Sequence, residues 1–288
     1  MPSRPEGCGG KVQKLKGPAV LNAVVFDLDD TLLHDDLTIS DFTVRVFEAL
    51  HEKGVHIIAA SGRSAFSMMP YVNQIGCLSA YISSNGAEIW DGPSHRLIRQ
   101  ELFSADLSVE IARFAEKYEC YAHVYDGSCF FYNRHGKWAD RYAAATRLTG
   151  VFAGKLSEFI REPRNKILMI DQEDRISTMY AAAVRQFENR ASVTCSKPIY
   201  LEFNPLNAQK GKALASVCSM LGILPEDTVA FGDSLNDLSM LQTAGTGVTV
   251  SNGWKEIRPF CDAVCLSNNE DGPAIYLNEH YLNGAVGI

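Results

Sequence analysis

Long apolar runs are absent from this sequence of 288 residues, and that absence argues against a membrane-spanning helix. No stretch approaches the ~20 consecutive apolar residues that a helix needs to cross a bilayer. Residues 1–17 contain Pro, Gly, Arg and Lys but lack the apolar run of about 7–15 residues that marks a secretory signal. We therefore expect a cytoplasmic protein with no membrane partner, whose residues 1–17 form a flexible tail.

Cys-x-x-Cys pairs are also absent, although the chain contains eight cysteines. Scattered cysteines without such pairs favour reduced thiols that mostly act as small core residues. The alternative is an adventitious metal ion or a disulfide at Cys261 and Cys265, which lie close together in the sequence.

The sequence also lacks an excess of positive charge. It contains 27 Lys and Arg residues and 34 Asp and Glu residues, which gives a formal net charge of −7. This balance argues against non-specific binding to nucleic acid or acidic membranes. A small local group of cations and backbone N–H groups can still hold an anionic ligand. The composition, 46% hydrophobic and 21% charged, is ordinary for a globular protein with a substantial core. The length predicts one large or two medium domains.

Short apolar segments alternate with amphipathic ones along most of the chain, which is typical of β-α repetition around a parallel sheet. The predicted strands are short and bounded by Gly, Asp, Ser or Asn; they span residues 23–26, 57–60, 81–83, 228–231 and 247–250. Continuous apolar strands of this kind suit burial on both faces of a sheet. A helix is expected from its N-cap Ser40 to about Lys53. A second is expected over residues 210–221, because Gly222 follows it.

The middle of the chain, from about residue 88 to 196, follows a different pattern. Its alternating, aromatic segments predict strands near residues 121–125, 129–133 and 166–170, and two helical patterns lie near 107–118 and 174–187. Strands and helices without a strict β-α-β order predict a separate α+β unit inserted into the first domain. Polar connections such as residues 91–94 are expected to lead into it.

Asp27, Asp29 and Thr31 follow the first predicted strand directly. In open α/β sheets, ligands bind at the carboxyl ends of the strands. Two neighbouring carboxylates are unfavourable together unless a cation compensates, and Mg²⁺ prefers carboxylates together with phosphate oxygens. The motif predicts that Asp27 attacks phosphorus as a nucleophile and that Asp29 acts as acid and then as base. A solvated acidic turn is the alternative.

Ser61, Gly62 and Arg63 follow the predicted strand 57–60. A serine hydroxyl and the N–H groups exposed by a glycine, at the start of a helix, are suited to binding phosphate. The alternative is a serine N-cap with a glycine in the turn. Asn85 follows the strand 81–83 in the same way and is expected near the substrate.

Lys210 lies at the start of a predicted helix, where the helix dipole disfavours a cation. That mismatch favours a role in neutralising a phosphoryl oxygen over an ordinary surface charge. Asp233, Asn236 and Asp237 follow the strand 228–231. Asp233 lies where a third carboxylate would meet a metal ion, Asn236 could orient the substrate, and Asp237 could hold either a metal-bound water or Lys210. A capped strand–helix turn is the alternative.

Taken together, these motifs resemble those of the haloacid dehalogenase superfamily of phosphatases, in particular its Cof-like branch. The matching strings are DLDDTLL (27–33), AASGRS (59–64), SSNGAEI (83–89), QKGKAL (209–214), GDSLNDLSML (232–241) and EDGPAIYL (270–277). The resemblance extends from the first strand nearly to the C-terminus. The chain departs from the family at Asp30, where Gly is usual, and this extra carboxylate could alter metal affinity or contacts of the inserted unit.

The resemblance implies an α/β fold in which a Rossmann-like core with a parallel sheet carries an inserted α+β cap. The core would comprise residues 18–88 and 195–288, and the cap residues 89–194. The cap is expected to close over the substrate and exclude water. Candidate specificity residues on the cap are His123, Tyr125, Asp126, Arg134, Arg164, Asn165 and Lys166.

The resemblance also implies roles for the motif residues. Mg²⁺ would be bound by Asp27, the backbone carbonyl of Asp29, and Asp233. The residues expected to contact phosphate or substrate are Ser61, Gly62, Lys210, Asn236 and Asn85, with Thr31, Arg63 and Asp237 in supporting positions.

The sequence thus predicts a Mg²⁺-dependent phosphomonoester hydrolase of small phosphorylated metabolites, acting through a phospho-aspartyl intermediate. A phosphosugar mutase on the same scaffold is one alternative. A phospho-receiver or binding module without turnover is another. The protein is expected to be a monomer or a homodimer and to bind no nucleic acid.

Overall fold

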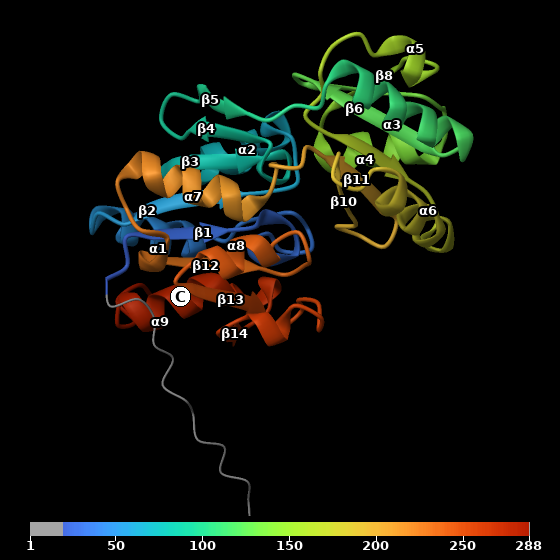
Figure 1. Ribbon diagram of the computed structural model, residues 1–288. Helices are drawn as coiled ribbons and strands as arrows, with labels where there is room; N and C mark the ends of the chain where they lie inside the picture. Colours follow the sequence, from blue (N-terminus) through green and yellow to red (C-terminus); the bar gives the residue numbers. More distant parts are fainter. Residues whose placement is uncertain (1–19, 288) are drawn as a thin grey trace, which may run out of the picture.

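Two β-sheets covered by helices form two domains (Figure 1). The computed structural model describes residues 20–287. The larger sheet has eight strands in the order β14-β13-β12-β1-β2-β3-β4-β5. These strands are β1 (Ala23–Phe26), β2 (His56–Ala60), β3 (Leu78–Ser83), β4 (Glu88–Asp91), β5 (Leu97–Gln100), β12 (Thr228–Gly232), β13 (Thr246–Val250) and β14 (Ala263–Cys265). We call this sheet with its helices the core domain.

The strands from β14 to β3 pair in parallel, whereas β4 and β5 continue the sheet antiparallel. Strand β1 lies centrally between β12 and β2. The predicted α/β fold with a parallel sheet is therefore confirmed.

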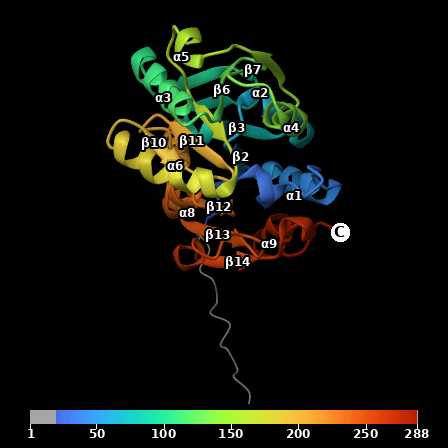
Figure 2. The ribbon, with the colours of Figure 1, turned by 90° about the vertical axis from the view of Figure 1, so that its right-hand side faces the viewer.

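Helices cover both faces of the core sheet (Figure 2). One face carries α1 (Asp41–Glu52), α2 (Ala65–Ile75) and α9 (Gly272–Tyr281), and the other carries α7 (Lys210–Leu221) and α8 (Leu238–Thr243). Alternate residues of β1 point to opposite faces, as strand geometry requires. Val24 and Phe26 pack under α1 and α2, while Ala23 and Val25 pack under α7.

Two predicted helices have the expected ends. The hydroxyl of the N-cap Ser40 accepts the N–H of Thr43 at 3.0 Å, and α1 ends at the C-cap Lys53. Helix α7 ends where Gly222 takes a φ of 70°, a left-handed conformation that glycine adopts without strain. Local capping signals therefore located both helices correctly.

The smaller sheet belongs to the inserted domain and has the order β10-β11-β9-β6-β7-β8. Its strands are β6 (Tyr121–Asp126), β7 (Cys129–Tyr132), β8 (Thr149–Phe152), β9 (Ile167–Ile170), β10 (Ser192–Thr194) and β11 (Tyr200–Asn204). Its helices are α3 (Ala105–Lys117), α4 (Lys137–Thr146), α5 (Leu156–Phe159) and α6 (Glu173–Gln186). Helices α3 and α6 pack on one face of the sheet and α4 packs on the other.

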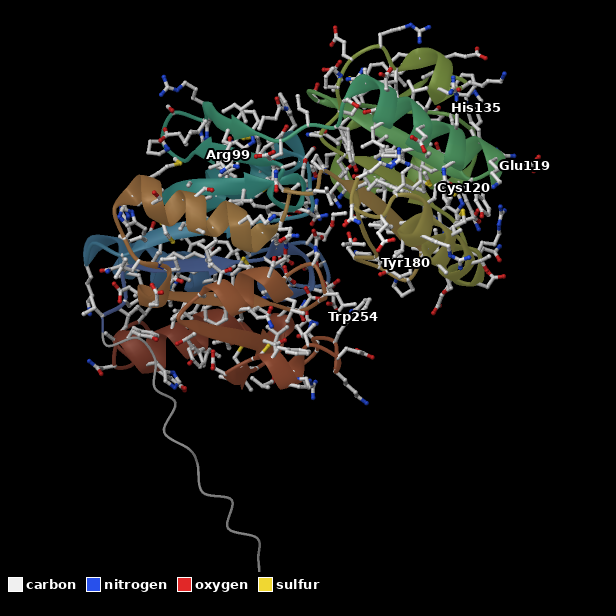
Figure 3. All side chains as sticks on the ribbon, viewed as in Figure 1. Arg99, Glu119, Cys120, His135, Tyr180 and Trp254 are labelled. Atoms are coloured by element: carbon white, nitrogen blue, oxygen red, sulfur yellow. The ribbon has the colours of Figure 1, made fainter. Side chains whose placement is uncertain are left out.

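The predicted limits of the inserted domain, residues 89–194, are wrong at both ends. Strands β4 and β5 form a hairpin paired to β3, so residues 91–94 are its turn and not a domain connection. Arg99 on β5, labelled in Figure 3, also donates to the hydroxyl of Ser216 on α7 at 2.8 Å. At the other end, β10 and β11 pair with β9. The reason is that a strand's own side-chain pattern does not specify which sheet it joins.

The predicted tail, residues 1–17, lies outside the described residues. Within residues 20–287, none of the helices combines the length and apolar character required for a membrane span.

Cys261 and Cys265 are both free thiols, so the alternative of a disulfide between them is wrong. Burial raises the pKa of Cys261 to about 11 and that of Cys265 to about 12, which disfavours the thiolate form that binds metals.

Phe47 on α1 is fully buried and stacks on Phe26 of β1, with 4.7 Å between ring centroids. We expect Phe47→Ala to lower the free energy of unfolding by about 3–5 kcal/mol, because it removes a buried ring and leaves a cavity. Urea unfolding followed by circular dichroism measures this loss. Leu224→Ala, at a side chain that is 63% exposed, is the control and should change stability by less than about 0.5 kcal/mol. Equal losses in the two variants would contradict this packing.

Candidate active site

Polar residues gather at the carboxyl edge of the core sheet. Asp27 follows β1, Ser61 follows β2, Ser84 and Asn85 follow β3, and Asp233 follows β12. These four strands are neighbours that run in parallel. Their carboxyl ends therefore direct these residues towards a common volume, where α/β sheets bind ligands.

A buried lysine links two aspartates at this edge. Lys210 Nζ donates to Asp27 Oδ1 and to Asp237 Oδ1, each at 2.6 Å. The other oxygen of Asp237 accepts the backbone N–H groups of Asp233 and Ser234, both at 3.1 Å. Of the two roles considered for Asp237, the geometry therefore favours holding Lys210, and it adds a role in holding the loop after β12.

The protonation of Lys210 is secured by its partners. Burial acts to lower the pKa of Lys210, but the charges of Asp237 and Asp27 outweigh it and raise the pKa above its usual value. The raised pKa keeps Lys210 protonated beside Asp27.

Asp27, Asp233 and Asp237 form a compact acidic cluster, with one oxygen from each within 4.8 Å of the others. Thr31 donates its hydroxyl to Asp233 Oδ1 at 3.1 Å. Burial raises the pKa of Asp27 to about 8, although Lys210 opposes it. Burial, followed by the charges of the other two aspartates, raises the pKa of Asp233 to about 9. Full ionisation of this cluster is thus unfavourable without a further cation.

The chemistry of these groups fits a divalent cation. Three carboxylates and one ammonium leave a net charge of −2, which a divalent cation neutralises. Both oxygens of Asp237 are already hydrogen-bonded, so Asp27 and Asp233 are the carboxylates best able to bind it. Two carboxylates suit Mg²⁺, which keeps several positions for water and phosphate oxygens. The predicted contribution of the Asp29 carbonyl stays a prediction.

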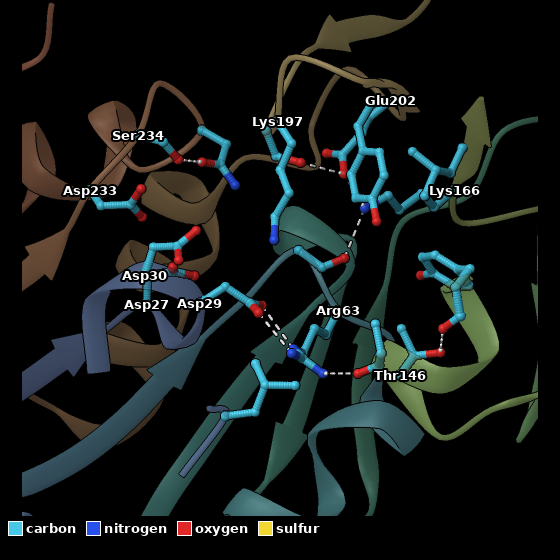
Figure 4. A pocket seen from close by; sticks show the side chains of 18 residues that line it. Asp27, Asp29, Asp30, Arg63, Thr146, Lys166, Lys197, Glu202, Asp233 and Ser234 are labelled. Atoms are coloured by element: carbon cyan, nitrogen blue, oxygen red, sulfur yellow. Dashed lines mark hydrogen bonds and ion pairs between the residues drawn. The ribbon is translucent and has the colours of Figure 1, made fainter. Parts of the chain in front are cut away.

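Asp29 directs its carboxylate to Arg63 (Figure 4). The Arg63 guanidinium donates to both oxygens of Asp29, at 2.8 and 2.7 Å. Burial acts to raise the pKa of Asp29, but the hydrogen bonds and charge of Arg63 reverse the effect and lower it. Arg63 also donates to the Ser67 hydroxyl at 3.2 Å and to the Ala145 carbonyl on α4 at 3.4 Å. The partner of Asp29 thus also contacts the inserted domain.

Asp30 lies in a left-handed conformation with a φ of 57°. Glycine adopts this conformation freely, and Asp is among the other residue types that tolerate it best. The Asp30 side chain lines the cavity described below. Burial and the charges of Asp237 and Asp27 are the larger causes of the raised pKa of Asp233, and the charge of Asp30 adds to them. The departure from the family pattern therefore acts on the acidic cluster itself.

Gly62, Asn85 and Asn236 meet although they follow three different strands. Asn236 Nδ2 donates to Asn85 Oδ1 at 3.1 Å. A Cβ at Gly62 would lie 2.9 Å from that same Oδ1, so a larger residue there would displace the Asn85 amide. Ser61 is buried beside them, and its hydroxyl accepts the N–H of Arg63 at 3.1 Å. The structure thus brings these predicted phosphate contacts together.

A cavity of about 120 Å³ lies between the two domains, over Asp27, Asp29 and Asp233 (Figure 4). The inserted domain lines it with residues that the sequence analysis did not identify: Tyr142, Ala145 and Thr146 of α4, Ser196 and Lys197 before β11, and Tyr200 and Glu202 on β11. Figure 4 shows the Lys197 ammonium directed into the cavity.

Of the seven residues predicted on the cap, Lys166 lines this cavity. The other six do not line it, and their role in specificity stays a prediction; they are His123, Tyr125, Asp126, Arg134, Arg164 and Asn165. His123 is fully buried, where its Nε2 and the Tyr125 hydroxyl lie 3.0 Å apart. The signal that could have identified the lining residues is the alternation of side chains along each strand. One sheet face lines the cavity through Lys166, Leu168, Tyr200 and Glu202. That face can be recognised only once the pairing of β9 with β11 is known.

A parallel sheet with an acidic carboxyl edge and a domain inserted over it is typical of α/β enzymes that bind a ligand between two domains. Residues 24–277 match the haloacid dehalogenase-like hydrolases, and the chain belongs to that family. One relative is the 5-amino-6-(5-phospho-D-ribitylamino)uracil phosphatase YcsE of Bacillus subtilis, 28% identical over 88% of this chain and 93% of that protein. Another is the HMP-PP phosphatase of Serratia proteamaculans, 29% identical over 89% and 92%. The predicted class, a phosphatase, is confirmed.

The solved structures agree on the fold. A haloacid dehalogenase-like hydrolase from Bacteroides thetaiotaomicron superposes with a TM-score of 0.82 over 91% of this chain and 100% of that one. The two chains are 23% identical, so this likeness concerns the fold alone.

The acidic cluster predicts a specific response to magnesium. Mg²⁺ at about 100 times its dissociation constant should stabilise the folded protein by about 2.7 kcal/mol, and thus raise the melting temperature. Asp233→Asn should remove this response and, without the cation, raise the melting temperature through relief of carboxylate repulsion. Thermal unfolding at constant ionic strength measures both effects, with Asp41→Asn on the surface as control. An unchanged magnesium response in Asp233→Asn would contradict the assignment.

Proposed function

We propose that the protein hydrolyses phosphomonoesters of small metabolites in a Mg²⁺-dependent reaction that passes through a phosphorylated Asp27. The observation that carries this proposal is the carboxylate of Asp27, anchored through Oδ1 to the buried Lys210 and placed beside Asp233 at the edge of the cavity. One oxygen is thus fixed by an ammonium, and the carboxylate is oriented for attack.

In the first step, Asp27 attacks phosphorus, and a bond between its carboxylate and phosphorus forms as the bond to the leaving oxygen breaks. A divalent cation held by Asp27 and Asp233 would supply positive charge at the phosphoryl oxygens. Lys210 adds a second charge. Asp29 protonates the leaving alkoxide, and because Arg63 keeps it ionised here, Asp29 must first release Arg63 and take up a proton from solvent. Water then attacks the phospho-aspartate, which releases phosphate and regenerates Asp27. The Arg63-bound carboxylate form of Asp29 is the form that accepts the proton from this water.

The inserted domain provides the groups for recognising the rest of the substrate. Tyr142, Tyr200 and Lys197 line the cavity opposite the acidic cluster. Lys197 forms no ion pair within the described part of the chain, whereas the other cations of the cavity and its floor are paired. An unpaired ammonium over an otherwise acidic cavity favours an anionic ligand such as a phosphorylated metabolite.

The names of the relatives favour hydrolysis over the mutase and over the binding module without turnover. Those relatives are named for different phosphorylated compounds, which supports small organic phosphates as the substrate class. Dependence on magnesium, a cytoplasmic location and a monomeric or homodimeric state stay predictions.

The decisive experiment measures phosphate release from a panel of phosphorylated metabolites with and without Mg²⁺. Activity should require Mg²⁺ and should fall at least about 10⁴-fold in Asp27→Asn, because the nucleophile is lost. Acid quenching during turnover, followed by peptide mass spectrometry, should find phosphate on Asp27 in the wild type. Substantial activity of Asp27→Asn, or phosphate on a different residue, would refute the mechanism.

The role of Lys197 is tested by Lys197→Met, which keeps the length of the side chain and removes its charge. The value of KM should rise about 3–10-fold while kcat changes little, because the lost contact binds ground state and transition state alike. Lys212→Met, on the exposed side of α7, is the matched control. An unchanged KM for every phosphorylated substrate would show that Lys197 does not bind the substrate.

A further inference from the structure

A buried ion pair lies in the inserted domain at its boundary with the core domain. Lys166 Nζ and Glu202 Oε1 are 2.9 Å apart, and the two side chains are 2% and 3% exposed. Ser196 donates its hydroxyl to the same Glu202 oxygen at 2.9 Å. Burying two charges is costly, and apolar residues of similar size often stabilise a protein equally well. Stability alone therefore gives little reason for this pair.

Both members of the pair reach across the domain boundary. Lys166 Nζ donates to the carbonyl of Gly62 at 2.8 Å. The second oxygen of Glu202 accepts the side-chain N–H of Asn85 at 2.6 Å. Each contact joins the inserted domain to a loop at the carboxyl edge of the core sheet.

Asn85 links Glu202 to Asn236 through hydrogen bonds of its side-chain amide. The oxygen of the Asn85 amide accepts from Asn236 Nδ2 at 3.1 Å, and the oxygen of the Asn236 amide accepts from the Ser234 hydroxyl at 2.6 Å. The backbone of Asn85 has a φ of 57°, a left-handed conformation that surrounding contacts must hold. Orientation of both amides thus depends on Glu202.

We propose that Lys166 and Glu202 are positioning residues that couple closure of the inserted domain to assembly of the phosphate site. In the closed arrangement, Lys166 holds the Gly62 loop, and Glu202 holds Asn85 and through it Asn236. When the inserted domain moves away, both loops lose these partners. The phosphate site is then complete only while the inserted domain shields it from water. This inference depends on the proposed function, because Gly62 and Asn236 are its phosphate contacts.

The key variants are Lys166→Met and Glu202→Gln, each of which keeps the side chain's size and removes its charge. The value of kcat should fall about 10²-fold in each, as is typical when reacting groups are misplaced. The inhibition constant for inorganic phosphate should rise about 10-fold. Lys166→Arg keeps the charge and should recover part of the activity. Lys155→Met and Glu158→Gln are matched controls, because this pair on the same domain is exposed (68% and 70%) and should have no effect.

A double variant, Lys166→Met with Glu202→Leu, separates positioning from simple stabilisation. If the pair only supported folding, its apolar replacement would restore both the melting temperature and kcat. Positioning predicts that the melting temperature recovers while kcat stays low, because the contacts to Gly62 and Asn85 are missing.

Hydrogen exchange of peptides covering residues 61–64 and 84–87 tests the coupling without any activity. Exchange there should be faster in Lys166→Met and Glu202→Gln than in the wild type. An active wild type whose variants match it in kcat and in exchange would overturn the coupling. A wild type that releases no phosphate from any substrate would instead overturn the proposed function, while the exchange result still judges the coupling.

Discussion

The site depends on one ammonium shared by two buried carboxylates. Lys210 comes from the start of α7, Asp27 follows β1, and Asp237 is the N-cap of α8, so this contact joins the ends of one strand and two helices. Burial is unfavourable for each charge alone, and the three are tolerated because they neutralise one another in part. What remains is a local excess of negative charge, and that excess is the basis for proposing a cation site at the carboxyl edge of the sheet.

The two domains contribute different residues to the cavity, and the geometry of each sheet determines which ones. The core domain supplies the groups proposed to act on phosphate, because its parallel strands end at a common edge. The inserted domain supplies one face of a mixed sheet, and alternation along β11 directs Tyr200 and Glu202 to the cavity while Leu201 and Phe203 pack under α3 and α6.

Strands, helices and motif order were largely predictable because each rests on a local signal. The strand 23–26 and helix α7 have the expected ends, and the residues placed at strand ends on motif grounds do meet. The limits of the inserted domain were not predictable, because the hairpin of β4 and β5 has no local feature that assigns it to the core sheet. The same holds for His123, a candidate specificity residue that packs among aromatic rings.

The sequence by itself determined the chemistry at the edge of the sheet, since local periodicity ends each strand where an acidic or hydroxyl residue follows. Tertiary structure alone decided which groups became partners: Asp29 with Arg63, Asp237 with Lys210, and Glu202 with Lys166 and Asn85. Asn85 and Glu202, for example, lie 117 positions apart in the chain, and only strand pairing and domain closure bring such groups within hydrogen-bonding distance.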